Sequence, residues 1–189
     1  MTELLDKAGA VRSGEELDAD KLRAFLAETV PGLEGDIAIE QFRSGFSNLT
    51  YLLRVGGHAM VLRRPPVGSK VKAAHDMGRE FRILDALHPV YPKAPKPLVY
   101  CEDPEVIGAP FYVMERVHGV ILRGKRPQDF ECSPETVRGC CESLVRGLAE
   151  LHAPDYEAIG LADLRREGSF VERNVRGWID RYYGSQTDE

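Results

Sequence analysis

Residues 37–64 read IAIEQFRSGFSNLTYLLRVGGHAMVLRR, and this stretch decides the fold. It contains three short extended runs in series, at residues 37–43, 49–55 and 58–64. A turn-forming stretch separates the first two runs, and Gly56-Gly57 is a two-residue hairpin signal between the last two. Pro65-Pro66 ends the third run because proline cannot donate a hydrogen bond to a sheet. We therefore expect an antiparallel meander.

Helices are expected on both sides of this meander. Ser69 is a candidate N-cap for a helix that continues to about Leu87, because apolar residues recur there at helical spacing. Residues 18–30 show the same periodicity and end at Pro31-Gly32, a combination that stops helices.

Two further strands are expected downstream. Four prolines between residues 89 and 97 predict a loop, and residues 98–101 and 111–117 are apolar runs of strand length. The order is then strand-strand-strand-helix-strand-strand. This order indicates an α+β fold in which one helix packs on an antiparallel sheet.

After Gly119 the pattern becomes helical. Ser133 as N-cap and Pro134 at the first helical position predict the start of one helix, and Ser169 predicts the start of another. The positions expected to be buried are Val137, Cys141, Leu144, Leu148 and Leu151 in the first helix and Val171, Val175, Trp178 and Tyr182 in the second. We therefore divide the chain into a leading helical segment (1–35), a sheet-rich lobe (36–118) and the start of a helical lobe (119–189).

Composition limits the partners that the chain can have. Of 189 residues, 43% are hydrophobic and 29% are charged, which is typical of a soluble globular protein. The net charge of −5 gives no overall basic field for nucleic acid, and local basic patches such as residues 123–126 can be solvated loops. No apolar run approaches the ~20 residues that cross a bilayer, and no secretory signal is visible. The four cysteines have no zinc-binding spacing, so we expect reduced thiols and a cytoplasmic protein without nucleic-acid or membrane partners.

Five motifs in this order resemble the aminoglycoside phosphotransferase family, whose fold is kinase-like. The motifs occupy residues 44–51 (SGFSNLTY), 61–66 (VLRRPP), 79–81 (REF), 111–119 (FYVMERVHG) and 148–152 (LAELH), and the resemblance extends from about residue 36 to 183. It is strongest for the branch of phosphotransferase domains that are fused to, or encoded beside, acyl-CoA dehydrogenases. The resemblance implies a kinase-like nucleotide-binding small lobe, a five-stranded antiparallel sheet plus one helix, followed by the first helices of the large lobe.

A loop of small and polar residues between two strands can place its backbone N–H groups over a triphosphate. By resemblance the nucleotide-binding residues of this loop are Ser44, Gly45, Phe46, Ser47 and Asn48. This loop contains a single glycine, whereas the Gly-x-Gly-x-x-Gly loop of protein kinases contains three. The side chains of Ser47 and Asn48 can supply hydrogen-bond donors instead. The alternative is a plain hairpin turn.

Kinase-like folds place a cation on the third strand, where it meets the phosphates and pairs with a helix glutamate. By resemblance this catalytic pair is Arg63 and Glu80, with Val61 lining the adenine. Arginine departs from the lysine usual in the family but can bind phosphate in a bidentate manner. If the register of the strand is shifted by one residue, Arg64 takes the phosphate-contacting role instead. The alternative for the pair is a surface ion pair worth ~0–1 kcal/mol.

The resemblance also assigns the segment that joins the two lobes. Met114 is expected at the rear of the nucleotide pocket, and Glu115 to Val117 are expected to present backbone groups to the base. The alternative interpretation is a buried strand followed by a loop.

Phosphoryl transfer needs a residue that orients the acceptor and carboxylates that hold Mg²⁺. In the family these come from a His-Gly-Asp loop with a following asparagine and then from an Asp-containing strand, and neither motif appears; His118-Gly119 precedes Val120 and falls too early. We therefore expect ATP to bind here, the Mg²⁺ ligands to lie outside the chain, and the separate chain to be inactive. A truncated piece of a longer enzyme, a split gene product and a native short protein all remain open.

Three functions are compatible with the sequence. The first is an ATP-dependent phosphotransferase of a small hydroxylated metabolite, for which the resemblance suggests a hydroxyacyl-CoA-like acceptor. The second is a non-catalytic nucleotide-binding or interaction module, and the third is an α+β domain without a nucleotide site. In each case the apolar stripes of the last two helices need cover, so we expect self-association or a partner.

Overall fold

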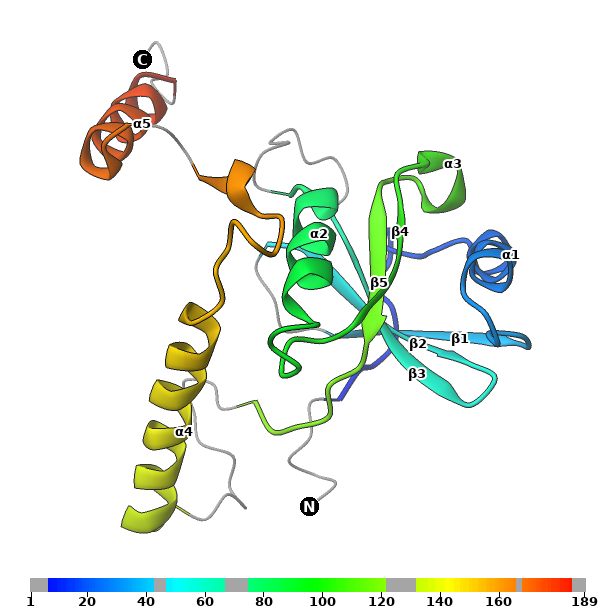
Figure 1. The fold of residues 1–189 in the computed structure, drawn as a ribbon. Helices are drawn as coiled ribbons and strands as arrows, with labels where there is room; N and C mark the ends of the chain where they lie inside the picture. The colour runs from blue at the N-terminus through cyan, green and yellow to red at the C-terminus, as the bar shows by residue number, and fades with distance from the viewer. Residues whose placement is uncertain (1–6, 43–46, 67–74, 122–131, 166–167, 185–189) are drawn as a thin grey trace. The chain divides into compact units, whose positions relative to one another are not determined.

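The computed structural model describes residues 7–42, 47–66, 75–121, 132–165 and 168–184 (Figure 1). The chain forms two compact units, Met1–Pro154 and Asp155–Glu189. The first unit contains the sheet, and the second contains a short 3-10 helix, η3 (Ala162–Leu164), and α5 (Phe170–Gly184). The lobe boundary predicted near residue 119 falls inside the first unit and stays a prediction.

Five strands form one antiparallel sheet in the order β1-β2-β3-β5-β4. Their bounds are Ile37–Phe42 for β1, Leu49–Val55 for β2, His58–Arg64 for β3, Pro97–Cys101 for β4 and Phe111–Glu115 for β5. The register places Thr50 opposite Arg63 and Val61 opposite Met114. The expected five-stranded α+β fold is therefore confirmed, although β5 ends two residues before the predicted Val117.

One face of the sheet carries the main hydrophobic core. Side chains alternate between faces along a strand, so Tyr51, Leu53 and Val55 of β2 point to this side. Helix α1 (Ala19–Thr29) covers it with the fully buried Leu22 and Leu26. Asp18 caps α1 by accepting the Lys21 backbone N–H at 3.0 Å.

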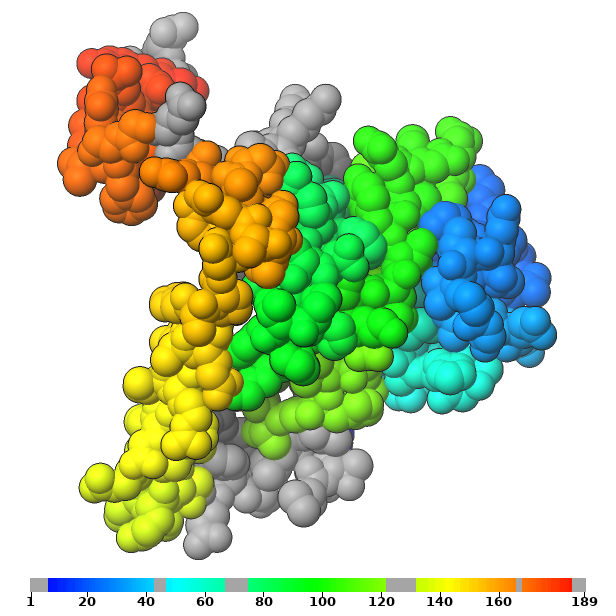
Figure 2. All heavy atoms as spheres, in the orientation of Figure 1, coloured from blue at the N-terminus to red at the C-terminus, as the bar shows by residue number. Residues whose placement is uncertain are grey.

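A short helix, α3 (Pro104–Ile107), follows β4 and was not predicted. Asp103 is its N-cap, and Gly108 closes it with a positive φ of 83°. Lys21 of α1 donates to the Glu105 carbonyl at 3.0 Å. Figure 2 shows α1 and α3 in contact at this side of the sheet.

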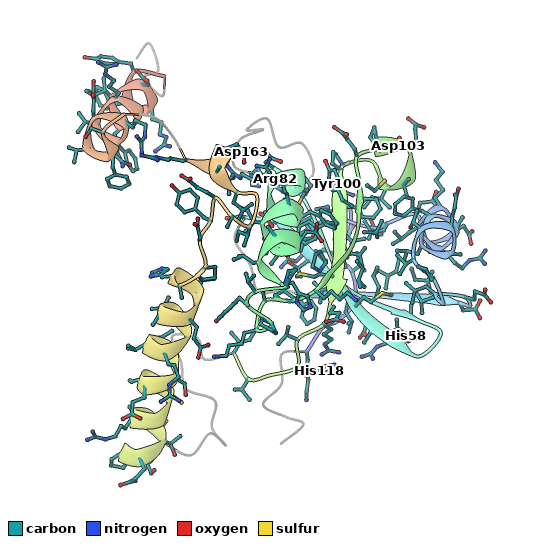
Figure 3. The ribbon with its side chains drawn as sticks, in the orientation of Figure 1. His58, Arg82, Tyr100, Asp103, His118 and Asp163 are labelled. Carbon is teal, nitrogen blue, oxygen red and sulfur yellow. The ribbon has the colours of Figure 1, made fainter. Side chains whose placement is uncertain are left out.

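Helix α2 (Met77–Leu87) packs on the opposite face of the sheet (Figure 1). Phe81 lies between Tyr100 of β4 and Tyr112 of β5, with ring centroids 5.8 and 6.4 Å apart. A Cβ added at Gly78 would lie 3.1 Å from the Tyr100 hydroxyl, so the helix approaches Tyr100 as closely as glycine allows (Figure 3).

The start of α2 corrects the sequence prediction. Ser69 lies outside the described residues, but His75 and Asp76 are not helical, and Asp76 caps the helix by accepting the Arg79 N–H at 2.9 Å. Aspartate is as good an N-cap as serine, and the helix begins after Asp76.

The chain before α1 is more than a leading helix. Gly9 forms an isolated bridge with Gln41 of β1, and the fully buried Gln41 side chain bonds to the Arg12 N–H at 2.9 Å and to Glu15. The Tyr51 hydroxyl donates to the Glu15 carbonyl at 2.7 Å. Burial raises the pKa of Tyr51 to about 12, which keeps this phenol a donor.

The stripes expected to be buried on the last two helices are exposed, which corrects that prediction. Helix α4 (Pro134–His152) has no buried residue, and Leu144 is 65% exposed. Trp178 of α5 is 66% exposed. Helix α4 is held by its C-terminal half, where Tyr91 donates to the Gly147 carbonyl at 3.4 Å and Lys93 pairs with Glu150. Among the described helices, none is both long enough and apolar enough to cross a bilayer.

We predict that Gly56→Ala destabilises the fold more than Gly57→Ala. Both glycines of the β2–β3 hairpin have positive φ, 54° and 86°, which costs another residue roughly 1–3 kcal/mol. A Cβ at Gly56 would also lie 2.7 Å from the Glu34 carbonyl oxygen, whereas a Cβ at Gly57 meets nothing within 4 Å. Urea denaturation should show a free energy of unfolding at least about 1 kcal/mol lower for Gly56→Ala than for Gly57→Ala. Equal losses would contradict this packing.

Candidate functional site

An open cavity of about 560 Å³ lies where the sheet meets the segment that follows β5. Its walls are formed by Phe42, Thr50, Val61, Lys93, Pro95, Met114, Glu115, Arg116, Val117, His118, Gly119, Val120 and Ile121. Four predicted nucleotide-binding residues therefore share one cavity: Val61, Met114, Glu115 and Val117. His118 lies on the segment after β5, as predicted from its early position in the chain (Figure 3).

Val61 and Met114 form the inner wall of this cavity. They are Cα partners across β3 and β5, so their side chains lie next to each other on the same face of the sheet. Val61 is 9% exposed. Two adjacent aliphatic side chains on a flat sheet give a surface that suits a planar heterocycle.

Arg63 continues from this wall toward α2. It lies two residues after Val61, on the same face of β3, and its Cα partner Thr50 also lines the cavity. The Arg63 Nη2 atom is 3.5 Å from Glu80 Oε2. Arg63 is not among the residues that line the cavity, and its Nε atom is buried without a hydrogen-bond partner among the described residues. The expected ion pair is therefore present.

Arg64 points to the other face of the sheet. It is 6% exposed, and its Nη1 atom donates to the Ile107 carbonyl at 2.8 Å while its Nε atom donates to the Pro65 carbonyl at 3.3 Å. These contacts tie β3 to the end of α3. Of the two arginines, Arg63 is the one on the cavity face, and Arg64 is structural.

Glu80 contacts residues of β3 and β5 and the residue that precedes β2. Its Oε1 atom accepts from Asn48 Nδ2 at 2.9 Å, and its Oε2 atom accepts from the Tyr112 hydroxyl at 2.9 Å, beside Arg63. Burial raises the pKa of Tyr112, so its phenol remains a donor to Glu80. His75 Nδ1 bonds to Asn48 Oδ1 at 2.6 Å.

Sequence reasoning missed two residues of this network, Tyr112 and His75. Strand periodicity could have found Tyr112, since it lies two residues before Met114 and so shares the same face. No sequence signal identifies His75, because its place depends on where α2 begins. In the predicted loop, Ser44, Gly45 and Phe46 lie outside the described residues, and Ser47 is exposed.

An apolar cavity wall with an arginine beside it on the same face of the sheet can hold a flat base that is attached to an anionic group. In the parts of the chain that the structure describes, no three His, Cys, Asp or Glu side chains cluster closely enough to hold a metal ion. We therefore give these residues no metal-binding role, and Mg²⁺ ligands from outside the chain stay a prediction.

Comparison with known proteins identifies the family. The sequence profile of the phosphotransferase enzyme family matches residues 38–189, most of the chain. The chain belongs to this family. This phosphotransferase domain also superimposes on the crystal structure of a Ralstonia eutropha protein assigned as an aminoglycoside phosphotransferase, with a TM-score of 0.72 and 33% identity. That match covers 92% of this chain and 50% of the other chain. The resemblance read from the sequence is thus confirmed, and the fold is the kinase-like one of that family.

The curated relatives of this phosphotransferase domain are much longer proteins. Acyl-CoA dehydrogenase family member 11 of Rattus norvegicus is 38% identical over 177 residues, which are 90% of this chain and 22% of the relative. The probable acyl-CoA dehydrogenase IBR3 of Arabidopsis thaliana is 34% identical over 193 residues, covering 97% of this chain and 23% of the relative. The chain therefore spans less than a quarter of these relatives.

We predict that the two neighbouring arginines differ in their effect on stability. Arg64→Ala removes a buried side chain and leaves the Ile107 carbonyl without its donor, so the free energy of unfolding should fall by about 2–4 kcal/mol. Arg63→Ala removes a partly exposed ion pair and should cost about 1 kcal/mol or less. Chemical denaturation of the two variants measures both values, and a larger loss for Arg63→Ala would contradict the assigned faces.

Proposed function

We propose that this chain is the nucleotide-binding part of an ATP-dependent phosphotransferase that acts on a small hydroxylated metabolite. The observation that carries the proposal is the continuity between the apolar wall at Val61 and Met114 and the Arg63–Glu80 pair. An adenine base against the wall leaves a phosphate group within the field of Arg63. The membership of a phosphotransferase family supports the same reading.

The chain's own residues have defined tasks in this proposal. Val61 and Met114 bind the base through apolar contact, and the backbone of Glu115 to Val117 presents hydrogen-bonding groups to its edge. Arg63 binds phosphate oxygen, and Glu80 keeps the guanidinium from folding back along the sheet. When bound, ATP supplies the phosphoryl group.

For the acceptor we propose a hydroxylated acyl-CoA-like metabolite. The support is the match of this domain to proteins named acyl-CoA dehydrogenases, in which it occupies only part of the chain. The transfer would move the terminal phosphoryl group to the acceptor hydroxyl oxygen, releasing ADP and a proton. The residues that orient this hydroxyl are expected outside the 189 residues, so we propose that the separate chain binds nucleotide without turnover.

Isothermal titration calorimetry tests the nucleotide site. We predict that Arg63→Ala weakens ATP binding by roughly 10-fold or more, because a charge-assisted phosphate contact is lost. Adenosine binding should change less than about 2-fold, since the base wall is intact.

Arg54→Ala is the matched control for this experiment. Arg54 lies on β2 of the same sheet and pairs with Glu40 at 3.2 Å, away from the cavity lining. Its removal should leave ATP affinity unchanged. ATP binding that survives Arg63→Ala intact would remove Arg63 from the site, and absent ATP binding by the unaltered chain would overturn the proposal.

A second candidate, an interaction module, is favoured by helix α4. Val137, Leu144 and Leu148 lie on one stripe of this helix and are 46–65% exposed. We propose that this stripe pairs with a second copy of the chain.

Sedimentation equilibrium tests the self-association. We predict a dimer at tens of micromolar that Leu144→Glu converts to a monomer, because burying a carboxylate in an apolar contact is costly. Arg146→Glu, which introduces the same charge about 200° around the helix, should leave the dimer intact. A monomeric wild-type chain at these concentrations would rule out this pairing.

A further inference from the structure

Glu80 is fixed more firmly by neutral donors than by its arginine partner. The contact from Arg63 Nη2 is 3.5 Å, which is long for a charge-assisted hydrogen bond. The contacts from Asn48 and Tyr112 are 2.9 Å each and reach different carboxylate oxygens. The orientation of the carboxylate is therefore set by these two residues.

The contacts of Asn48 fix the orientation of its amide. A carboxylate oxygen accepts hydrogen bonds, so the Asn48 atom that faces Glu80 must be the NH₂ group. The amide oxygen then faces His75, whose Nδ1 atom donates to it at 2.6 Å. Both ends of the side chain are thus occupied within the protein.

This arrangement differs from the role expected from the sequence, in which the Asn48 amide is itself a phosphate donor. Here the amide bonds to Glu80, which in turn faces Arg63. Asn48 precedes β2, His75 precedes α2, and Arg63 is on β3, so one short chain of polar contacts joins three parts of the chain.

We propose that Asn48 is a positioning residue: through Glu80 it holds the Arg63 guanidinium toward the phosphates of the nucleotide. This rests on the proposed nucleotide site. Tyr112 performs the same task from β5. Without Asn48, Glu80 loses the donor on Oε1 and is free to rotate, and Arg63 loses its fixed counter-charge. The nucleoside part of the ligand does not depend on this network, because Val61 and Met114 belong to the sheet.

The test compares ATP and adenosine binding in the full 189-residue chain. Asn48→Ala should weaken ATP binding by roughly 5- to 10-fold, the loss expected for one ordinary hydrogen bond, and should leave adenosine binding within about 2-fold. Asn48→Asp keeps the side-chain size but puts a second carboxylate beside Glu80, and its loss should be at least as large. Asn174→Ala is the control, since Asn174 bonds to the Phe170 carbonyl within α5 and should alter neither ligand.

A double variant separates positioning from direct contact. If Asn48 acts through Arg63, Asn48→Ala should change ATP affinity by less than about 2-fold once Arg63→Ala is present. Additive losses would show that Asn48 touches the phosphates itself and would overturn the proposal. Equal losses for ATP and adenosine would overturn it as well, because they indicate a general structural defect.

The same data separate this inference from the proposed function. If the wild-type chain binds ATP, and Arg63→Ala lowers the ATP affinity while Asn48→Ala does not, the proposed nucleotide site stands. Only the role of Asn48 is then removed. Wild-type chain that does not bind ATP overturns both. Circular dichroism of each variant confirms that the compared chains are folded.

Discussion

The carboxylate of Glu80 joins α2 to the sheet. It accepts from Asn48 and Tyr112 and faces Arg63, so β3, β5 and the residue before β2 all meet α2 at one acidic group. The same helix packs against the sheet through Phe81 and approaches Tyr100 closely at Gly78. Both the packing on this face of the sheet and the polar contacts of Glu80 therefore depend on α2.

The sheet could be predicted from the sequence because its determinants are local. Two residues of a glycine hairpin fix the register of β2 against β3, and both strands have the bounds expected from residues 49–55 and 58–64. The start of α2 could not be predicted, because Ser69 and Asp76 are equivalent as caps in sequence terms. The prediction that the apolar stripe of α4 is buried was wrong for a related reason. Periodicity identifies an apolar stripe, but it does not say whether this chain supplies the residues that cover it.

Of the candidate site, several residues that the resemblance assigned are brought together. Val61 and Met114 line one cavity, and Arg63 pairs with Glu80 beside it on the same face of the sheet. The choice between Arg63 and Arg64 needed the structure, since only the buried contact of Arg64 with Ile107 shows which face each occupies. Asn48 was identified by its loop position, but its partners come from elements 27 and 32 residues away and leave no trace in local sequence.

An arginine on β3 has a chemical consequence for reagents. Arginine does not lose its proton in proteins, so β3 offers no nucleophilic amine to the cavity, whereas a lysine at this position could be acylated. Nucleotide analogues that carry an electrophile for amines would meet Lys93 instead, which lines the same cavity and is engaged by Glu150 of α4. Covalent labelling of this site would thus report on the contact of α4 with residues next to the cavity, a different property from phosphate contact.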